Sequence, residues 1–407
     1  MSFLIPSRRA RPSDDPIFAL NAEARARAAS GEAIINATVG SLLDDAGKLA
    51  ILGSVAQTLR EVSPVEAAGY APIAGPPGFL RAVIADLLGD RPEAAWAVAV
   101  ATPGGTGALR HAIANFLEPG QSVLTTSFFW GPYKTLTDEG DRRLTTFRMF
   151  NEHGHLDTED LDEQLTEQQA REGRALIFLN SPCHNPTGYS FDDAEWSAVV
   201  DVVGRASARG PVTLLIDLAY ALYGANDPRA ATGRLLELAG KALLLFAWSA
   251  SKAFTEYGLR VGALVAVHPD PAERQRVHNA LSFSCRGTWS NCNAGGMAAI
   301  TRILTDPELH ARVDRERAAL KALLDQRVAR WNELAGPARL RYPRCDGGFF
   351  TTVFCEEADV AAAKLRADGI FVVPQQGALR VALCSVTDRE IPQLVEGIAK
   401  HTASPLA

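Results

Sequence analysis

Short apolar runs recur along the chain, and stretches with a helical pattern separate them. The runs are AWAVAV ending at Val100, SVLTT at Thr126, ALIFLN at Asn180, VTLLID at Asp217, ALLLFAW at Trp248 and VGALVAV at Val267. Continuous apolar runs of this length are typical of strands that are buried on both faces of a parallel sheet. The stretches between them, such as TGALRHAIANFL, have the periodicity of helices. This alternation predicts a doubly wound α/β domain with a large, mostly parallel sheet.

The sheet domain is expected at residues 47–309, and a smaller α/β unit is expected beyond it. A long amphipathic helical pattern runs from Asp306 to Leu334. After it, GGFFTTVF, IFVVP and ALRVALC alternate with a helical pattern at DVAAAKLRADG. Residues 310–407 therefore predict the smaller domain, to which the N-terminal residues 1–46 are expected to add. A cleft between two such domains is a common ligand site.

Composition and charge exclude several classes of protein. The 407 residues are 47% hydrophobic and 22% charged, which is a globular composition with ample material for a core. The net charge of -6 argues against a nucleic-acid partner. The chain has no long apolar run and only a short one near its start, so neither a membrane span nor a signal peptide is expected. Six scattered cysteines without a C-x-x-C pair favour reduced thiols in a cytoplasmic protein and argue against a metal site.

The segment FAWSASKAFTEYGLRVG, residues 246–262, contains the spacing S-x-x-K at Ser249 and Lys252. This spacing occurs in penicillin-binding proteins and class A lactamases, in which the serine is the nucleophile. Those enzymes also need S-D-N and K-T-G elements, and neither string occurs in this sequence. A G-x-S-x-G elbow is absent as well. The hydrolase hypothesis is therefore disfavoured, which leaves Lys252 as a reactive amine or as an ordinary surface lysine.

Polar residues follow the ends of successive predicted strands, where open α/β sheets bind their ligands. A Gly-rich turn with Gly105 and Thr106 opens a helix, and its backbone N–H groups can hold a phosphate. Asp217 ends another strand, and a carboxylate buried there needs a cationic partner. The other polar residues at these ends are Asn185, Tyr220, Ser249, Lys252 and Arg260. A phosphate cradle, a carboxylate, a phenol, an amide and a lysine match the needs of pyridoxal 5′-phosphate.

At these motifs the chain resembles the class I aminotransferases of the aspartate and aromatic amino acid group. The resemblance runs from about Asn36 to Cys384, and its motifs are YAPIAG, HNPTG, DLAY, SASKAFTEYGLRVG and LRVAL. It implies the fold of type I pyridoxal-phosphate-dependent transferases, with a seven-stranded sheet in the large domain. It also implies a transaminase that moves the amino group between an L-amino acid, aspartate or aromatic, and a 2-oxo acid such as 2-oxoglutarate.

The resemblance implies a role for each cofactor-binding position. Lys252 would hold the cofactor as a Schiff base and carry the proton between the substrate and the cofactor. Asp217 would keep the ring nitrogen protonated, and Tyr220 and Asn185 would bind the ring's 3-oxygen. The other implied contacts are the phosphate ligands Gly105, Thr106, Ser249 and Arg260, the stacking residue Trp130, and Tyr70, which would reach the phosphate of the partner subunit.

The same resemblance implies a substrate site and a homodimer with composite active sites. Arg380 would clamp the substrate carboxylate in a bidentate pair, close to Trp130 and Asn185. Gly40, in NATVGSLLDD, would belong to a substrate-contact loop. Arg286, in SCRGTWSN, matches an arginine that reaches across the dimer to a side-chain carboxylate. Because dual-specificity enzymes also carry this arginine, it supports dicarboxylate substrates without excluding tyrosine or phenylalanine.

Two departures from the family pattern leave the specificity open. Gly104 stands where some relatives carry a serine, and Pro132 of WGPY stands where the W-x-N-H pattern has an asparagine that helps to bind the substrate. One alternative is another enzyme of this fold that uses pyridoxal phosphate, such as a β-lyase, decarboxylase or racemase, since the cofactor motifs are shared. Another is a non-catalytic, aminotransferase-like regulator domain, which the acidic charge and the short N-terminal segment disfavour.

Overall fold

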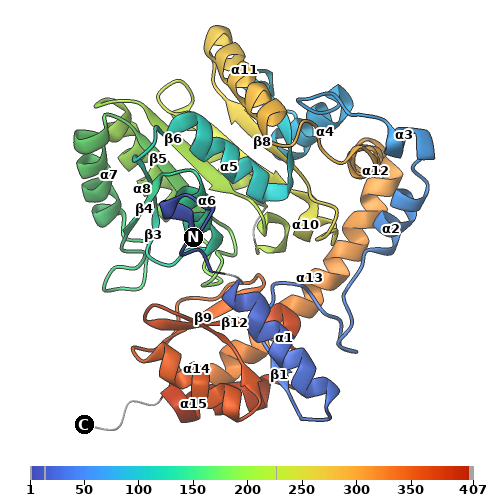
Figure 1. Ribbon diagram of the computed structural model, residues 1–407, viewed down its shortest axis with the longest axis vertical. Coiled ribbons are helices and arrows are strands. Elements are labelled where there is room, and N and C mark those ends of the chain that lie inside the picture. Colours follow the sequence, from blue (N-terminus) through green and yellow to red (C-terminus); the bar gives the residue numbers. More distant parts are fainter. Residues whose placement is uncertain (1, 13–14, 226, 403–407) are drawn as a thin grey trace. The chain divides into compact units, whose positions relative to one another are not determined.

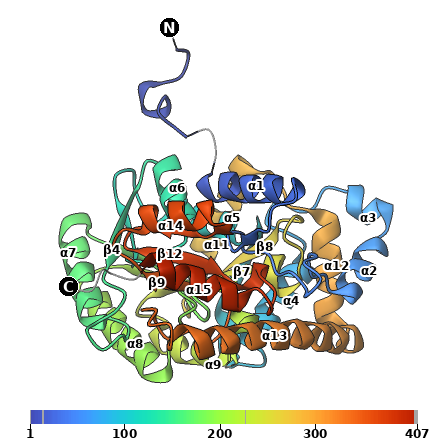
Figure 2. The ribbon, with the colours of Figure 1, turned by 90° about the horizontal axis from the view of Figure 1, so that it is seen from below.

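The computed structural model describes residues 2–12, 15–225 and 227–402 (Figures 1 and 2). The chain divides into two compact units. The larger comprises Ala50–Asp325 and Pro343–Gly348, and the smaller comprises Met1–Leu49, Gln326–Tyr342 and Phe349–Ala407. Helix α13, Pro307–Ala335, contributes residues to both units. The division into domains at residues 46/47 and 309/310 stays a prediction.

The larger unit contains a seven-stranded sheet in the order β2-β8-β7-β6-β5-β3-β4. Its strands are β2 (Ala97–Pro103), β3 (Ser122–Thr126), β4 (Arg143–Phe147), β5 (Ala175–Asn180), β6 (Val212–Asp217), β7 (Leu243–Ser249) and β8 (Val261–Val267). Strand β8 runs antiparallel to both of its neighbours, and the other pairs are parallel. The predicted α/β fold with a mostly parallel sheet is therefore confirmed.

Both faces of this sheet are buried, because successive residues of each central strand enter different hydrophobic clusters. On β6, Leu214 and Ile216 belong to one cluster and Leu215 belongs to the other. Helices α5 (Gly104–Phe116) and α11 (Pro271–Thr288) cover the face of Leu215. Helices α4 (Pro77–Leu88), α7 (Thr158–Glu172) and α8 (Asp193–Ser207) cover the opposite face (Figure 1). The continuous apolar runs of the sequence reflect this burial on both sides.

The remaining helices of the larger unit are shorter, or lie outside these two layers. They are α2 (Gly53–Arg60), α3 (Pro64–Ala68), α6 (Pro132–Glu139), α9 (Pro228–Leu235), α10 (Ala250–Ala253) and α12 (Ala294–Thr305). Within the described residues, none of the helices combines the length and the apolar character that crossing a membrane requires.

The smaller unit contains a three-stranded antiparallel sheet in the order β11-β12-β9 and a two-stranded parallel pair of β1 and β10. The strands are β1 (Ile35–Asn36), β9 (Phe350–Phe354), β10 (Ile370–Phe371), β11 (Val373–Gln375) and β12 (Ala378–Ala382). Its helices are α1 (Pro16–Ala29), α14 (Ala358–Ala367) and α15 (Ile391–Thr402), besides the end of α13. Arg380 pairs with Thr352 in the register of β12 and β9, which places Arg380 in the middle of this sheet.

Candidate active site

The polar ends of three neighbouring parallel strands meet at one edge of the large sheet. Asn180 ends β5 and pairs with Asp217, the last residue of β6, and Asp217 pairs with Ala247 of β7. Strand β7 then ends at Ser249, and Lys252 follows on α10. A pocket of about 160 Å³ opens at this edge. It is lined by Gly105, Thr106, Leu109, Trp130, Asn180, Asn185, Asp217, Ala219, Tyr220, Ser249, Ser251, Lys252 and Arg260.

One part of the pocket has the donors that an anion needs. Gly105 and Thr106 lie in the first turn of α5, where backbone N–H groups have no acceptor within their own helix. Arg260 donates from Nη1 to Ser251 Oγ at 3.1 Å and to the Tyr257 carbonyl at 2.9 Å. Burial lowers the pKa of Arg260, yet a guanidinium remains charged at neutral pH. A fixed cation beside a helix N-terminus suits a phosphate group.

Asp217 supplies the opposite charge. Its side chain is buried, its Oδ2 accepts a hydrogen bond of 2.8 Å from the Tyr133 hydroxyl, and its Oδ1 accepts one of 3.1 Å from the Ala219 N–H. Burial raises the pKa of Asp217, while these hydrogen bonds and the charge of Lys252 act in the opposite direction. A buried carboxylate whose pKa is raised by burial is stabilised in its charged form by a further cationic partner, such as a protonated ring nitrogen.

Asn180 holds two of the predicted site residues in place, although the sequence interpretation gave it no role. Its Nδ2 donates to the Asp217 carbonyl at 2.8 Å, and its Oδ1 accepts from the Asn185 N–H at 2.7 Å. Asn185 in turn donates from Nδ2 to the Tyr220 hydroxyl at 3.2 Å. Its Oδ1 is buried and has no hydrogen-bond partner among the described residues. The available signal was the position of Asn180, a polar residue that ends an otherwise apolar strand run.

Lys252 lies in this pocket close to two phenol rings. Ser249, which precedes it, caps the helix that carries Lys252 and is not placed as a nucleophile. Lys252 Nζ is 5.5 Å from the centre of the Tyr220 ring and 5.9 Å from that of Tyr257. The Ser249 hydroxyl accepts a hydrogen bond of 3.2 Å from the Ser251 N–H and caps α10. This geometry agrees with a reactive lysine and gives Ser249 a structural position at the start of the helix.

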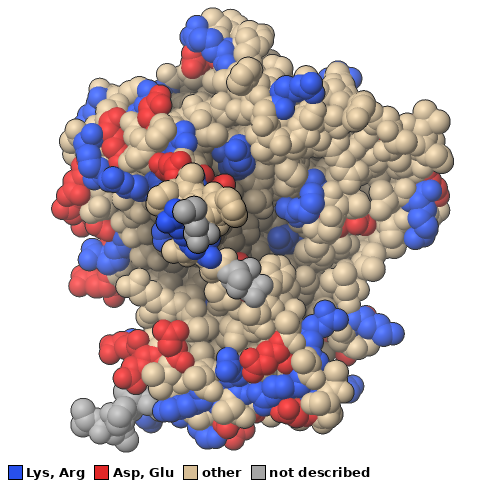
Figure 3. Space-filling view, viewed as in Figure 1, with Lys and Arg blue, Asp and Glu red and all other residues tan. Residues whose placement is uncertain are grey.

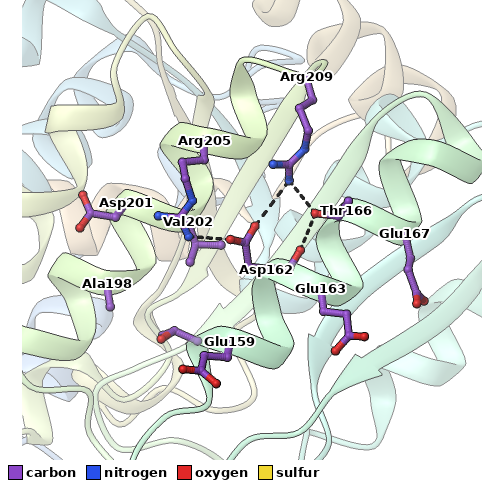
Figure 4. Close-up of a pocket in the computed structure, with 11 residues that line it drawn as sticks. Glu159, Asp162, Glu163, Thr166, Glu167, Ala198, Asp201, Val202, Arg205 and Arg209 are labelled. Carbon is purple, nitrogen blue, oxygen red and sulfur yellow. Dashed lines mark hydrogen bonds and ion pairs between the residues drawn. The ribbon is translucent and has the colours of Figure 1, made fainter.

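A wider groove of about 680 Å³ lies between α7 and α8, but its chemistry is that of a solvated surface (Figure 4). Asp162 accepts from Arg205 at 2.6 Å and lies 3.5 Å from Arg209. Because these charges pair with one another at the surface, the groove presents no reactive group comparable to Lys252. The smaller pocket is the candidate active site.

A family model described as aminotransferase class I and II matches residues 32–398. The chain belongs to this family. The resemblance that the motifs suggested is thereby confirmed, and the protein is an aminotransferase. The lyase and regulator alternatives are not favoured by these matches.

Relatives of both substrate groups resemble this aminotransferase. The aromatic-amino-acid aminotransferase of Paracoccus denitrificans is 29% identical over 94% of this chain and 96% of its own. The aspartate aminotransferase of Pseudomonas aeruginosa is 31% identical over 79% of this chain and 80% of its own. Because the two relatives differ in their named substrate, they leave the preferred amino acid open.

The fold of this protein resembles those of solved structures over nearly the whole chain. An aminotransferase from Anaerococcus prevotii has a TM-score of 0.93 and 30% identity, covering 99% of this chain and 100% of its own. The aromatic-amino-acid aminotransferase of Burkholderia pseudomallei, covalently bound to pyridoxal phosphate, has a TM-score of 0.82 and 25% identity, covering 98% and 100%. The predicted fold of pyridoxal-phosphate-dependent transferases is therefore confirmed.

Two predicted substrate residues of the aminotransferase, Gly40 and Arg380, lie together in the smaller unit. The Arg380 guanidinium lies 4.7 Å from the centre of the Phe350 ring, and its Nη2 donates to the Thr38 carbonyl. A Cβ at Gly40 would come within 2.6 Å of the same ring. With Phe350 in this position, a Cβ at residue 40 would collide with the ring that also packs against the Arg380 guanidinium. Their role in substrate binding stays a prediction.

Tyr70 and Arg286 belong to the larger unit but do not line its pocket. The side chain of Tyr70 is 95% exposed. Arg286 is exposed near the end of α11 and donates from Nη1 to Ser290 Oγ at 2.7 Å. Both were predicted to act on the site of a partner subunit, and that role stays a prediction.

Proposed function

We propose that this aminotransferase binds pyridoxal 5′-phosphate in the strand-end pocket and transfers the amino group of aspartate, an aromatic L-amino acid, or both. The acceptor would be a 2-oxo acid such as 2-oxoglutarate. The observation that carries the proposal is the joint lining of one pocket by Lys252, the buried Asp217 and the anion-binding residues of α5 and Arg260. The cofactor bound in the Burkholderia pseudomallei relative supports the same assignment.

The residues present fit each part of this cofactor. The first turn of α5, Ser249 and Arg260 would hold the phosphate. Asp217 would hold a proton at the ring nitrogen, and Asn185 Nδ2, which donates one N–H to the Tyr220 hydroxyl, has a second N–H for the ring's 3-oxygen. When bound, pyridoxal phosphate supplies an aldehyde that condenses with amines and a ring that accepts an electron pair.

Side chains of this protein would bond the cofactor, move the proton and bind the substrate. Lys252 Nζ would be the amine that bonds the cofactor, and it would move a proton at the substrate α-carbon. Tyr220 and Asn185 would bind the 3-oxygen, and Trp130 would stack on the ring. Arg380 would bind the substrate carboxylate with two parallel hydrogen bonds.

We also propose a homodimer in the cytoplasm, with Tyr70 and Arg286 completing the site of the partner. Val65 and Phe283, on the same unit as Tyr70, expose large apolar side chains that a second copy would cover. All six cysteines lie within the described residues and are free thiols, which suits a reducing compartment. Basic and acidic side chains are interspersed on the face seen in Figure 3, which suits small-molecule substrates better than nucleic acid.

The decisive experiment is a half-reaction with aspartate and, separately, with tyrosine. The purified holoenzyme should lose the absorbance band of its bound cofactor and release one keto acid for each amino group taken up. A lyase or decarboxylase would release ammonia or carbon dioxide instead, and an inert protein that binds DNA would support the regulator alternative.

A variant of Arg286 separates the two substrate groups. Arg286→Gln should lower kcat/KM for aspartate on the order of a hundredfold and change that for tyrosine little, because in the proposed role the lost charge would contact only a side-chain carboxylate. Arg276→Gln is the matched control, since Arg276 lies on the same helix and pairs with Glu273 at the surface. Equal effects of Arg286→Gln on both substrates would refute its role in specificity.

A further inference from the structure

The hydroxyl of Tyr133 contacts the carboxylate at the centre of the candidate site. Tyr133 lies in the first turn of α6 and is the last residue of the WGPY motif. Its hydroxyl donates to Asp217 Oδ2 at 2.8 Å, although 84 residues separate the two positions. Tyr133 is 1% exposed, so this bond is shielded from water. A buried hydrogen bond to a carboxylate is stronger than an exposed one between neutral groups.

Aromatic rings packed against Tyr133 restrict the direction in which its hydroxyl points. The ring packs edge-on against Trp130, with ring centres 5.9 Å apart, and against Phe178, with ring centres 5.4 Å apart. The other oxygen of Asp217 accepts the Ala219 N–H at 3.1 Å. Each carboxylate oxygen therefore has one fixed donor, and together the two donors fix the plane of the carboxylate.

A phenol is suited to this task because it donates without carrying a charge. Burial raises the pKa of Tyr133 well above its usual range, so the hydroxyl keeps its proton at any working pH. The other charged or titratable groups that interact with this pair are Lys252 and Tyr220. The negative charge of Asp217 is thus oriented by Tyr133 but not neutralised by it.

We infer that Tyr133 is a positioning residue that aims the Asp217 carboxylate at the ring nitrogen of the cofactor. This inference rests on the proposed function, since it presupposes that pyridoxal phosphate occupies the pocket. It assigns a role to Tyr133, the last residue of the WGPY motif, to which the sequence interpretation gave none. Tyr133 does not line the pocket, so it would act only through Asp217.

The test compares two ligands that differ only at the ring nitrogen. Full-length protein freed of cofactor is titrated with pyridoxal 5′-phosphate and with its deaza analogue, in which a C–H group replaces that nitrogen, and binding is followed by tryptophan fluorescence. Tyr133→Phe should weaken binding of pyridoxal phosphate about tenfold or more and leave binding of the deaza analogue unchanged. Equal weakening of both ligands, or of neither, would overturn the inference.

Two further variants separate positioning from a structural role. Tyr133→His keeps a ring N–H donor and should restore part of the affinity for pyridoxal phosphate; an affinity no better than that of Tyr133→Phe would count against the inference. If Tyr133→Phe fails to fold, Tyr133→His is compared with the wild type instead, and an equal loss of affinity for pyridoxal phosphate and for the deaza analogue would overturn the inference. Tyr189→Phe is the matched control, because Tyr189 is a buried phenol that donates to Glu195 at 2.5 Å outside the pocket. It should leave both affinities unchanged.

Different results would refute the proposed function and the role of Tyr133. Wild-type protein that binds neither ligand would refute the proposed function itself. Wild-type protein that binds pyridoxal phosphate, together with a Tyr133→Phe variant that discriminates the two ligands as the wild type does, would refute only the role of Tyr133.

Discussion

A single methyl group at Gly104 should displace the arginine that the phosphate needs. Gly104 is the first residue of α5 and has a φ of 68°, in the left-handed region that glycine adopts without strain. A Cβ built at this position would clash with Nη2 of Arg260 and lie 2.9 Å from its Cζ. The guanidinium cannot simply turn away, because Nη1 is bonded to Ser251 and to the Tyr257 carbonyl.

The expected effect of Gly104→Ala has two parts. The left-handed backbone conformation costs about 1–2 kcal/mol of folding stability for a residue with a Cβ. Displacement of Arg260 removes a charge-assisted contact with the phosphate, worth about 1.5–3 kcal/mol, which corresponds to a roughly 10- to 150-fold weaker binding of pyridoxal 5′-phosphate. Pyridoxal, which has no phosphate, should lose little affinity.

The assay is a fluorescence titration of cofactor-free protein with pyridoxal 5′-phosphate and with pyridoxal. Gly120→Ala is the matched control, because Gly120 has a φ of 84° and a Cβ there would have no described atom within 4 Å. Both variants should lose similar stability, and only Gly104→Ala should lose affinity for the phosphate form. If the two variants bind pyridoxal phosphate equally well, the contact between position 104 and Arg260 does not control the phosphate site.

Three further predictions concern His111, Asn180 and Lys252. Burial against Trp289 lowers the pKa of His111 to about 4, so the unfolded chain takes up a proton below pH 6.5 that the folded protein does not. Stability should therefore fall as the pH drops from 6.5 toward 4, by about 2 kcal/mol at pH 5 on account of this residue. Urea unfolding at pH 7 and pH 5 should show that loss in the wild type and not in His111→Phe, and an identical pH dependence would refute the assignment. Asn180→Ala should lower both the Tm and the cofactor affinity, because it removes the bonds to Asp217 and to the Asn185 N–H; a change in neither would show that this link is dispensable. Lys252→Ala should show no cofactor mass after borohydride reduction and no transamination, and turnover by this variant would exclude Lys252 as the reactive amine.

The apolar runs predicted six of the seven strands of the large sheet, because each of these strands is buried on both faces and its local composition records that burial. Strand β4, Arg143–Phe147, was missed because its sequence RLTTF is not an apolar run, and of its residues only Phe147 is buried. The pocket was predictable for a related reason. The carboxyl ends of neighbouring parallel strands share one edge, so polar residues such as Asp217 and Lys252 that follow the runs must lie near one another.

The sequence by itself thus determined the fold class, the family and the residues around the candidate site. Only the tertiary structure decided which of these side chains touch. It brings the Tyr133 hydroxyl to Asp217, sets Arg260 against Gly104, and makes Asn180 a link between two strand ends. Periodicity and composition record whether a position is buried, which is a local property of the chain. A hydrogen bond or a steric clash between distant residues depends on how the elements pack, and no local pattern records it.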